Sequence, residues 1–167
     1  GLGALSMIVA LVGMAALNAL SVALVLALAG VWSRREIGAW LREARGWLRG
    51  GLPASGWERT LARFAVVLLA LALPLATLPP AQWDTLTYHL AGPQTYVAEG
   101  RFFAAPHNHF LGFPQLVDTL YTAQLALTGR LTGAGPLHFW MGVLALLMTG
   151  SYAARVAGRA AGWIAAI

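Results

Sequence analysis

The sequence predicts an all-α protein, a polytopic bundle of transmembrane helices with short interfacial helices in an extracytoplasmic loop. The 167 residues are 59% hydrophobic and only 10% charged, with a mean hydropathy of +0.68. These values lie outside the range of an ordinary soluble domain. Several apolar runs are long enough to cross a bilayer, and most of the basic residues, all of them arginine, gather in one loop.

The composition also limits the kinds of site and partner. The chain has no cysteine, so disulfides and thiolate metal sites are excluded. A sequence pI near 10.8 would suggest nucleic acid in a soluble chain. Membrane topology and anionic lipid explain it with fewer assumptions, so we expect membrane lipid and no nucleic acid as partners. Because the chain begins and ends inside apolar runs, we expect a fragment whose other partners are the remaining helices of a longer protein.

The first expected element is one transmembrane helix over residues 1–32. Its uncharged stretch Leu2–Trp32 would be about 46 Å long as a helix, against a hydrocarbon core of roughly 30 Å. The spare length predicts a tilted helix, or a preceding loop that ends near Gly13. Asn18 and Ser21 are the notable polar side chains of this run, and we expect them to hydrogen-bond a neighbouring helix.

Residues 33–63 are expected to form a cytoplasmic loop, because seven arginines outnumber three glutamates there. Within this loop an apolar and a basic face alternate at helical spacing, which predicts an amphipathic helix on the inner leaflet that ends at Gly50. The alternative is a solvated loop with no ligand. The apolar face carries Ile37, Trp40, Leu41, Ala44, Trp47 and Leu48, and the basic face carries Arg34, Arg35, Arg42, Arg45 and Arg49.

Residues 64–167 are expected to form the N-terminal part of a transmembrane core. Leu61–Leu78 predicts a span of about 27 Å, and Pro79 and Pro80 would end it. If this span runs from inside to outside, loop 79–113 emerges on the extracytoplasmic face.

Two short helices are expected in loop 79–113, both lying along the outer interface. Trp83–Leu90 is aromatic-flanked and helical in pattern, and Pro93 would open a second helix that runs through Glu99 and is closed by Gly100. Arg101–Phe113, which contains further proline and glycine, is expected to be irregular.

The remaining apolar segments leave a question of topology open. Pro114–Gly129 would be about 24 Å long, so it either packs against other helices with Asp118 near the outer surface or is re-entrant. Pro136–Tyr152 is expected to cross the bilayer. If both segments cross, Arg155 and Arg159 fall on the outer side, against the usual charge bias. Either Pro114–Gly129 does not cross, or these arginines meet an anion outside.

Asp84 is the strongest candidate for chemistry, because it lies just beyond a predicted span with Tyr88 and His89 four and five residues later. A carboxylate there can orient or deprotonate a hydroxyl, or bind a divalent cation with a second acid such as Asp118. The alternative is that Asp84 merely caps a helix that begins at Thr85.

A weaker pattern suggests a metal site. His107 and His109 are two residues apart, so in extended chain both imidazoles would point the same way toward one metal ion. Asp84, His89 or Asp118 would complete the ligand shell. Alternatively, the two histidines bond backbone or lipid headgroups.

The polar stretch from Trp83 to Tyr121 also resembles a known family. The string WDTLTYHLAGPQTYVAEGRF, followed by a loop and then by FPQLVDTLY, resembles the first extracytoplasmic loop of bacterial members of the C-type glycosyltransferase (GT-C) superfamily. These polytopic enzymes of the cell envelope use polyprenyl-phosphate sugars. The likeness covers roughly Leu61–Ile167 and is densest in the pattern Asp-x-x-x-Tyr-His and in Phe-Pro-x-x-x-acid-x-x-Tyr.

The resemblance implies a multi-pass protein of the bacterial inner membrane, with an inverting sugar transfer to an acceptor hydroxyl on the extracytoplasmic face. It implies that Asp84 positions and activates the acceptor, in some relatives with a divalent metal ion. Such a transition state also needs positive charge near the departing phosphate. The residues expected to bind substrate are Tyr88, His89 and Asp118 on the acceptor side and Arg155 and Arg159 on the phosphate side.

Two other functions are compatible with a membrane protein of this composition. A transporter or flippase for a lipid-linked or anionic solute would carry its charges near the midplane, on broken helices in repeated halves. The polar groups here gather toward one surface, and the sequence shows no repeat. A non-catalytic membrane assembly subunit would need no acid–base residue at all.

Overall fold

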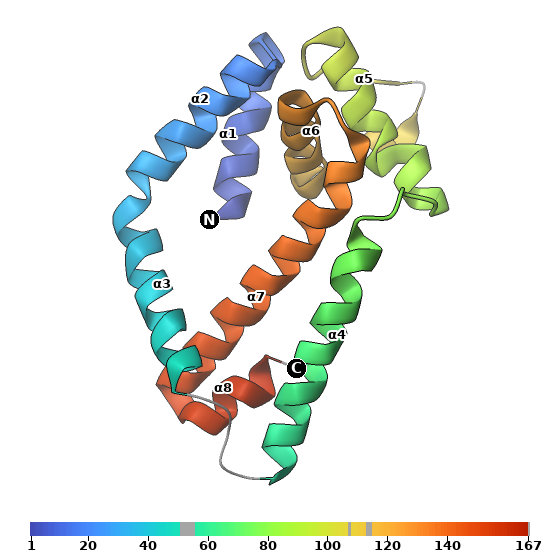
Figure 1. Ribbon diagram of the computed structural model, residues 1–167. Helices are drawn as coiled ribbons and strands as arrows, with labels where there is room; N and C mark the ends of the chain where they lie inside the picture. Colours follow the sequence, from blue (N-terminus) through green and yellow to red (C-terminus); the bar gives the residue numbers. More distant parts are fainter. Residues whose placement is uncertain (51–55, 107, 113–114, 167) are drawn as a thin grey trace. The chain divides into compact units, whose positions relative to one another are not determined.

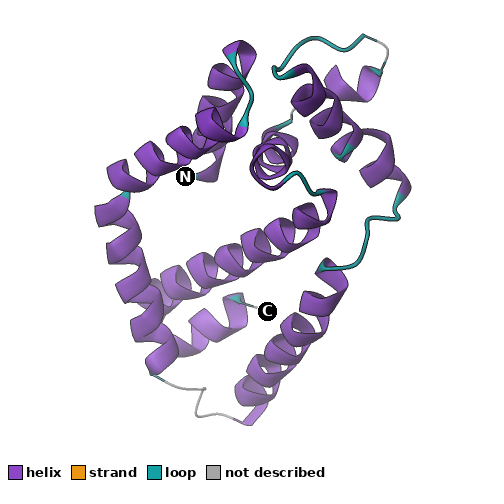
Figure 2. Ribbon diagram, turned by 45° about the horizontal axis from the view of Figure 1, so that its top comes forward, coloured by secondary structure: helices purple, strands orange, loops and turns teal. Residues whose placement is uncertain are grey.

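The computed structural model describes residues 1–50, 56–106, 108–112 and 115–166. Within these ranges every regular element is a helix and none is a strand, as the composition predicts (Figure 2). The chain forms two compact units. The first unit combines Gly1–Trp32 with Leu78–Leu137, and the second combines Ser33–Thr77 with His138–Ile167.

The apolar run at the start of the first unit forms two helices rather than one. Helix α1 (Leu2–Ala15) and helix α2 (Ala19–Trp32) pack against each other as a hairpin (Figure 1). Between them Ala16 is extended, with φ −154° and ψ 110°. The expectation of a single helix is therefore wrong. Each helix has 14 residues and is about 21 Å long, shorter than the hydrocarbon core of a bilayer.

The break in this run is made by Asn18 and Ser21, which bond each other rather than a neighbouring helix. The Asn18 Oδ1 accepts a hydrogen bond from the backbone N–H of Ser21 at 3.0 Å, and the Ser21 Oγ accepts one from the backbone N–H of Asn18 at 3.1 Å. This is a reciprocal capping box, which satisfies two otherwise unbonded N–H groups at the start of α2.

The cap gives a testable prediction. Asn18→Ala removes the acceptor for the Ser21 N–H and is expected to lower the free energy of unfolding by about 1 kcal/mol. Asn18→Asp keeps an acceptor oxygen at the same position and should retain most of the stability. Thermal unfolding of the two variants in detergent measures the difference. Equal melting temperatures would show that the break in the apolar run does not depend on this cap.

Helix α6 (Leu116–Thr128) is the central helix of the first unit. It lies between the α1–α2 hairpin and helix α5 (Ala91–Glu99) in both views (Figure 1, Figure 2) and contacts all three helices. Its 13 residues span about 20 Å, and six of them are buried. This favours the expected alternative in which the segment packs against other helices. The core of the unit comprises Val9, Leu17, Val22, Val25, Tyr96 and Ala123.

The turn of the hairpin is tied to the end of α5. Gly100 adopts φ 69° and closes α5, as predicted, because glycine enters the left-handed region without steric cost. Its carbonyl accepts a hydrogen bond from the Leu17 N–H at 2.6 Å, and the Gly13 carbonyl accepts one from the Phe102 N–H at 2.9 Å. A Cβ at position 13 would lie 2.6 Å from the Phe102 ring, so only glycine fits there.

The second unit holds α3 (Arg34–Arg49), α4 (Gly56–Ala76), most of α7 (Ala134–Ala157) and α8 (Arg159–Ala165). Helix α3 coincides with the predicted amphipathic helix and ends at Gly50. Helix α4 begins at Gly56 rather than Leu61 and ends close to the predicted boundary.

Two helices of the described residues are long and apolar enough to cross a membrane. They are Gly56–Ala76, with 21 residues, and the stretch Leu131–Ala157, with 27 residues that include α7. Only 6% of each apolar window is buried inside the protein. A core helix of a soluble domain would be mostly covered, so this exposure favours contact with lipid.

Trp47 fills a space that two glycines leave open in the second unit. Its ring lies 4.8 Å from that of Trp163, measured between centroids. A Cβ at position 150 would lie 2.5 Å from the Trp47 indole, and one at position 162 would lie 2.7 Å from it. These contacts join α3 to α7 and α8.

A matched pair of glycines in α7 tests this packing. Gly150→Ala forces the Trp47 ring to move and is expected to lower the free energy of unfolding by about 1 to 3 kcal/mol. Gly142→Ala, on the same helix, meets nothing within 4 Å and should leave stability unchanged or raise it by up to about 1 kcal/mol. Thermal unfolding in detergent compares them. A stable Gly150→Ala variant would contradict the packing of α3 on α7.

Candidate functional site

Asp84 lies at the start of a helical turn but does not cap it. Its backbone is itself helical, with φ −57° and ψ −43°, and its side chain makes no capping hydrogen bond. The capping alternative is therefore wrong. The turn that follows, η1 (Thr85–His89), is a π-helix with an i to i+5 hydrogen bond from the Leu90 N–H to the Thr85 carbonyl at 2.9 Å. Such turns are rare and concentrate at functional sites. The carboxylate of Asp84 is exposed to solvent.

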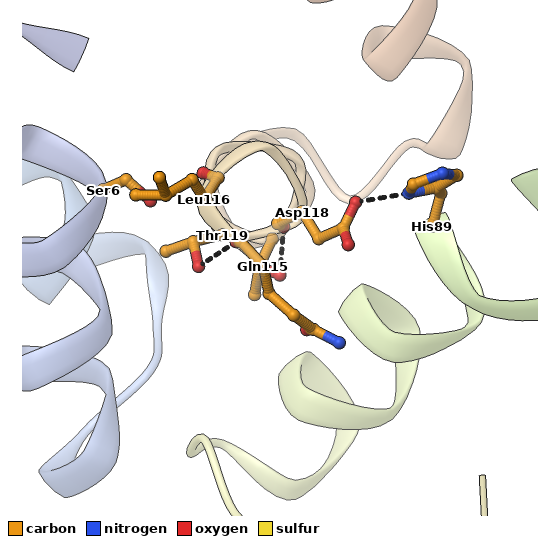
Figure 3. A network of polar contacts seen from close by, with 7 residues as sticks. Ser6, His89, Gln115, Leu116, Asp118 and Thr119 are labelled. Carbon is orange, nitrogen blue, oxygen red and sulfur yellow. Dashed lines mark hydrogen bonds and ion pairs between the residues drawn. The ribbon is translucent and has the colours of Figure 1, made fainter. Parts of the chain in front are cut away.

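The π-turn brings His89 to Asp118, 29 residues later in the chain. The His89 Nδ1 lies 2.7 Å from the Asp118 Oδ1 (Figure 3). The Asp118 side chain is only 7% exposed, whereas the His89 side chain is 39% exposed. A neutral His89 that donates Nδ1–H to this carboxylate keeps the lone pair of its Nε2 as a hydrogen-bond acceptor. The pair thus combines a buried acid with a partly exposed imidazole.

Asp118 is held in place by the first turn of α6. Its backbone carbonyl accepts a hydrogen bond from the Thr122 hydroxyl at 2.7 Å, and Thr122 is fully buried. One residue after Asp118, the Thr119 hydroxyl bonds the Gln115 carbonyl at 2.7 Å (Figure 3). A carboxylate in the first turn is also favoured by the helix dipole. From α1, the buried Ser6 hydroxyl donates to the carbonyl of Leu116 at 2.6 Å.

The pKa values of Asp118 and Tyr88 are both raised in this site. Burial raises the pKa of Asp118 above its ordinary 3.8, and the hydrogen bond and charge of His89 offset only part of the rise. Desolvation also raises the pKa of the Tyr88 phenol, and the negative charges of Asp84 and then Asp118 add to this rise. Tyr88 therefore remains a neutral hydroxyl donor at physiological pH. Both carboxylates act on the same phenol, which places them in one electrostatic neighbourhood.

Asn108 fixes the loop beside the π-turn, and the sequence interpretation did not assign it a role. Its Nδ2 donates to the Thr87 carbonyl at 3.0 Å, and its Oδ1 accepts from the Phe110 N–H at 3.2 Å. Phe110 stacks on Tyr88 with centroids 5.1 Å apart. A signal for this role was present, since asparagine in a proline-bounded loop favours such backbone-bonded turns.

The predicted metal site finds little support. His109 is exposed and packs its ring on Phe110 with centroids 4.0 Å apart. His107 lies outside the described residues. Across residues 1–50, 56–106, 108–112 and 115–166, no three side chains of His, Asp or Glu gather closely enough to hold a metal ion. Because His107 is outside these ranges, a metal site that combines His107 with His109 stays a prediction.

Arg155 and Arg159 lie in the second unit and contact α3. The Arg155 Nε is 3.7 Å from the Glu43 Oε1, and the Arg159 guanidinium donates to the Gly50 carbonyl. Both arginines thus lie at the same end of the unit as the arginine-rich helix. Both arginines therefore share the side of α3, whichever face of a membrane that is.

No family model matches this chain, and no curated protein or solved structure does. The assignment of a function therefore rests on the residues and their geometry.

Proposed function

We propose that this chain is part of an integral membrane glycosyltransferase that moves a sugar from polyprenyl phosphate to an acceptor hydroxyl on the extracytoplasmic face. One observation carries the proposal most directly. The Asp84 carboxylate is exposed, serves no cap, and shares an electrostatic neighbourhood with Tyr88 and Asp118. The motif around it resembles that of C-type glycosyltransferases, in which an acid at this position activates the acceptor.

In the proposed reaction Asp84 takes the proton of the acceptor hydroxyl. The acceptor oxygen then attacks the anomeric carbon while the bond from that carbon to the lipid phosphate breaks on the opposite side, with inversion. The lipid phosphate leaves as an anion. In this proposal Tyr88 donates a hydrogen bond to the acceptor, the Nε2 of His89 accepts one from it, and Asp118 orients His89. Arg155 and Arg159 contact α3 and take no part in binding the phosphate.

In the proposed topology the chain crosses the membrane at α4 and α7 and also along α2, because Leu17 bonds Gly100 in the extracytoplasmic part while α3, which follows α2 directly, is cytoplasmic. Helix α4 leaves the cytoplasmic face and α7 returns to it, so that the chain between them, including Asp84 and Asp118, is extracytoplasmic. This arrangement keeps residues 33–63 and also Arg155 and Arg159 on the cytoplasmic side, in agreement with the positive-inside rule. The exposed apolar windows of the two candidate spans support it.

Cysteine labelling tests this topology cleanly, because the chain has no cysteine of its own. Gln82→Cys is expected to react with a membrane-impermeant maleimide in intact cells. Gly46→Cys and Arg155→Cys should react only after permeabilisation. Position 46 is a suitable control because it is exposed and a Cβ there meets nothing within 4 Å. Reaction of position 82 only from the cytosol would remove the proposed function, and reaction of position 155 from outside would show that 114–129 crosses.

A further inference from the structure

Helix α3 has an apolar stripe that the described residues of the second unit leave largely exposed. Ile37, Leu41 and Leu48 are 45%, 46% and 43% exposed. At about 100° per residue, these three side chains fall within one narrow sector of the helix. Large exposed apolar residues that line up in this way indicate a contact surface rather than scattered surface residues.

The packing of α3 fixes which way this stripe points within the second unit. Ala44 and Trp47 are buried, and Trp47 packs against Gly150, Gly162 and Trp163 of the two following helices. This buried face lies directly beside the apolar stripe. The stripe is therefore the edge of the α3 face that the rest of the unit leaves uncovered.

The arginines of α3 flank the stripe on its other side. The residues in this basic sector are Arg34, Arg35, Arg42, Arg45 and Arg49. Glu36 and Glu43 fall on the far side of the helix, and Glu43 is the residue that contacts Arg155. Around the helix the acidic residues are thus followed by the buried face, then by the exposed apolar stripe and then by the basic sector. The packed face and the apolar stripe separate the basic sector from the acids on one side of the helix, and Ala39 and Gly46 separate them on the other.

We propose that this surface binds an anionic phospholipid bilayer, with the apolar stripe in the acyl boundary and the arginines on headgroup phosphates. An apolar stripe bordered by cations is the pattern of a helix that lies in a membrane interface. Guanidinium groups bond phosphate oxygens in forked geometry, which favours anionic headgroups over zwitterionic ones. A nucleic acid would match the arginines but would leave the apolar stripe in water.

A fluorescent reporter on the stripe tests the proposal. The variant Leu41→Cys is labelled with bimane and reconstituted into phosphatidylcholine bilayers. One set of bilayers contains brominated phosphatidylglycerol, and the other contains brominated phosphatidylcholine. We expect lipid bromines to quench the bimane, with stronger association for phosphatidylglycerol. In the background Arg42→Gln with Arg45→Gln, this preference should fall by roughly fivefold for each arginine removed, since one arginine near an anionic surface contributes about 1 kcal/mol.

The matched control is Arg101→Gln with Arg130→Gln, which removes the same charge from residues of the first unit. We expect this control to keep the full preference for phosphatidylglycerol. An unquenched bimane would show that another part of the protein covers the stripe, and would overturn the proposal. Equal quenching by the two lipids, or an equal loss in both double variants, would overturn the selectivity for anionic lipid.

Discussion

Asp84→Asn is expected to lower the turnover number of sugar transfer by about 10²- to 10⁴-fold, the usual contribution of a positioned acid–base group. The amide keeps the size of the side chain but cannot take the acceptor proton. Because the Asp84 side chain is exposed and caps no helix, its replacement should change the free energy of unfolding by less than about 0.5 kcal/mol. Transfer from a polyprenyl-phosphate sugar, assayed beside thermal unfolding, separates the two effects.

The matched control for this variant is Glu99→Gln. Glu99 is an exposed carboxylate at the end of α5, so its loss changes the charge of the same unit by the same amount. We expect wild-type transfer from it. Wild-type turnover in Asp84→Asn would remove Asp84 as the base and, with it, the proposed mechanism. Equal losses in both variants would point to a general effect of charge instead.

Asp118→Asn is expected to lower transfer by about 10- to 100-fold, as when the group that orients a functional histidine is removed. An amide at this position can donate to His89 Nδ1 instead of accepting from it. His89 would then carry its proton on Nε2 and lose its acceptor for substrate. Because Asp118 acts through His89, Asp118→Asn, His89→Ala and the double variant should show similar losses in kcat/KM. Losses that multiply in the double variant would show that the two residues act independently.

The pH dependence of stability gives a second measure of Asp118. A carboxyl whose pKa is raised in the folded state binds its proton more tightly there than in the unfolded chain. Its contribution to stability is therefore complete below the ordinary pKa of 3.8 and declines as pH rises above that value. Relative to Asp118→Asn, the wild-type protein should lose free energy of unfolding as pH rises from about 4. A difference between the two that does not vary with pH would show that burial leaves this carboxyl unperturbed.

The sequence predicts those helices whose bounds are marked by an amphipathic pattern or by a terminal glycine. The amphipathic pattern of α3 predicts its bounds because arginines and apolar residues alternate at helical spacing, and Gly100 marks the end of α5 because only glycine takes its conformation at no cost. The break between α1 and α2 was missed. Neither proline nor charge marks it, and its cap consists of two small polar residues inside an apolar run.

The residues of the site could be predicted from the sequence, but the bond between His89 and Asp118 could not. Asp84, His89 and Asp118 stand out in the sequence because they are polar residues in an apolar chain. The bond between His89 and Asp118 depends on how α5 and the π-turn pack against α6, which no local spacing encodes. In the same way, the contact of Arg155 with Glu43 depends on the glycines that let α3 approach α7.

The α1–α2 hairpin is attached to α6, so a truncation that removes the hairpin would disturb that helix. The first 32 residues are an uncharged apolar run, yet the Ser6 hydroxyl bonds α6 at Leu116, two residues from Asp118, and Val22 shares the core with Ala123. Removal of residues 1–32 would take away the hairpin against which α6, the helix of Asp118, packs. The hairpin is therefore part of the structural support of the His89–Asp118 pair.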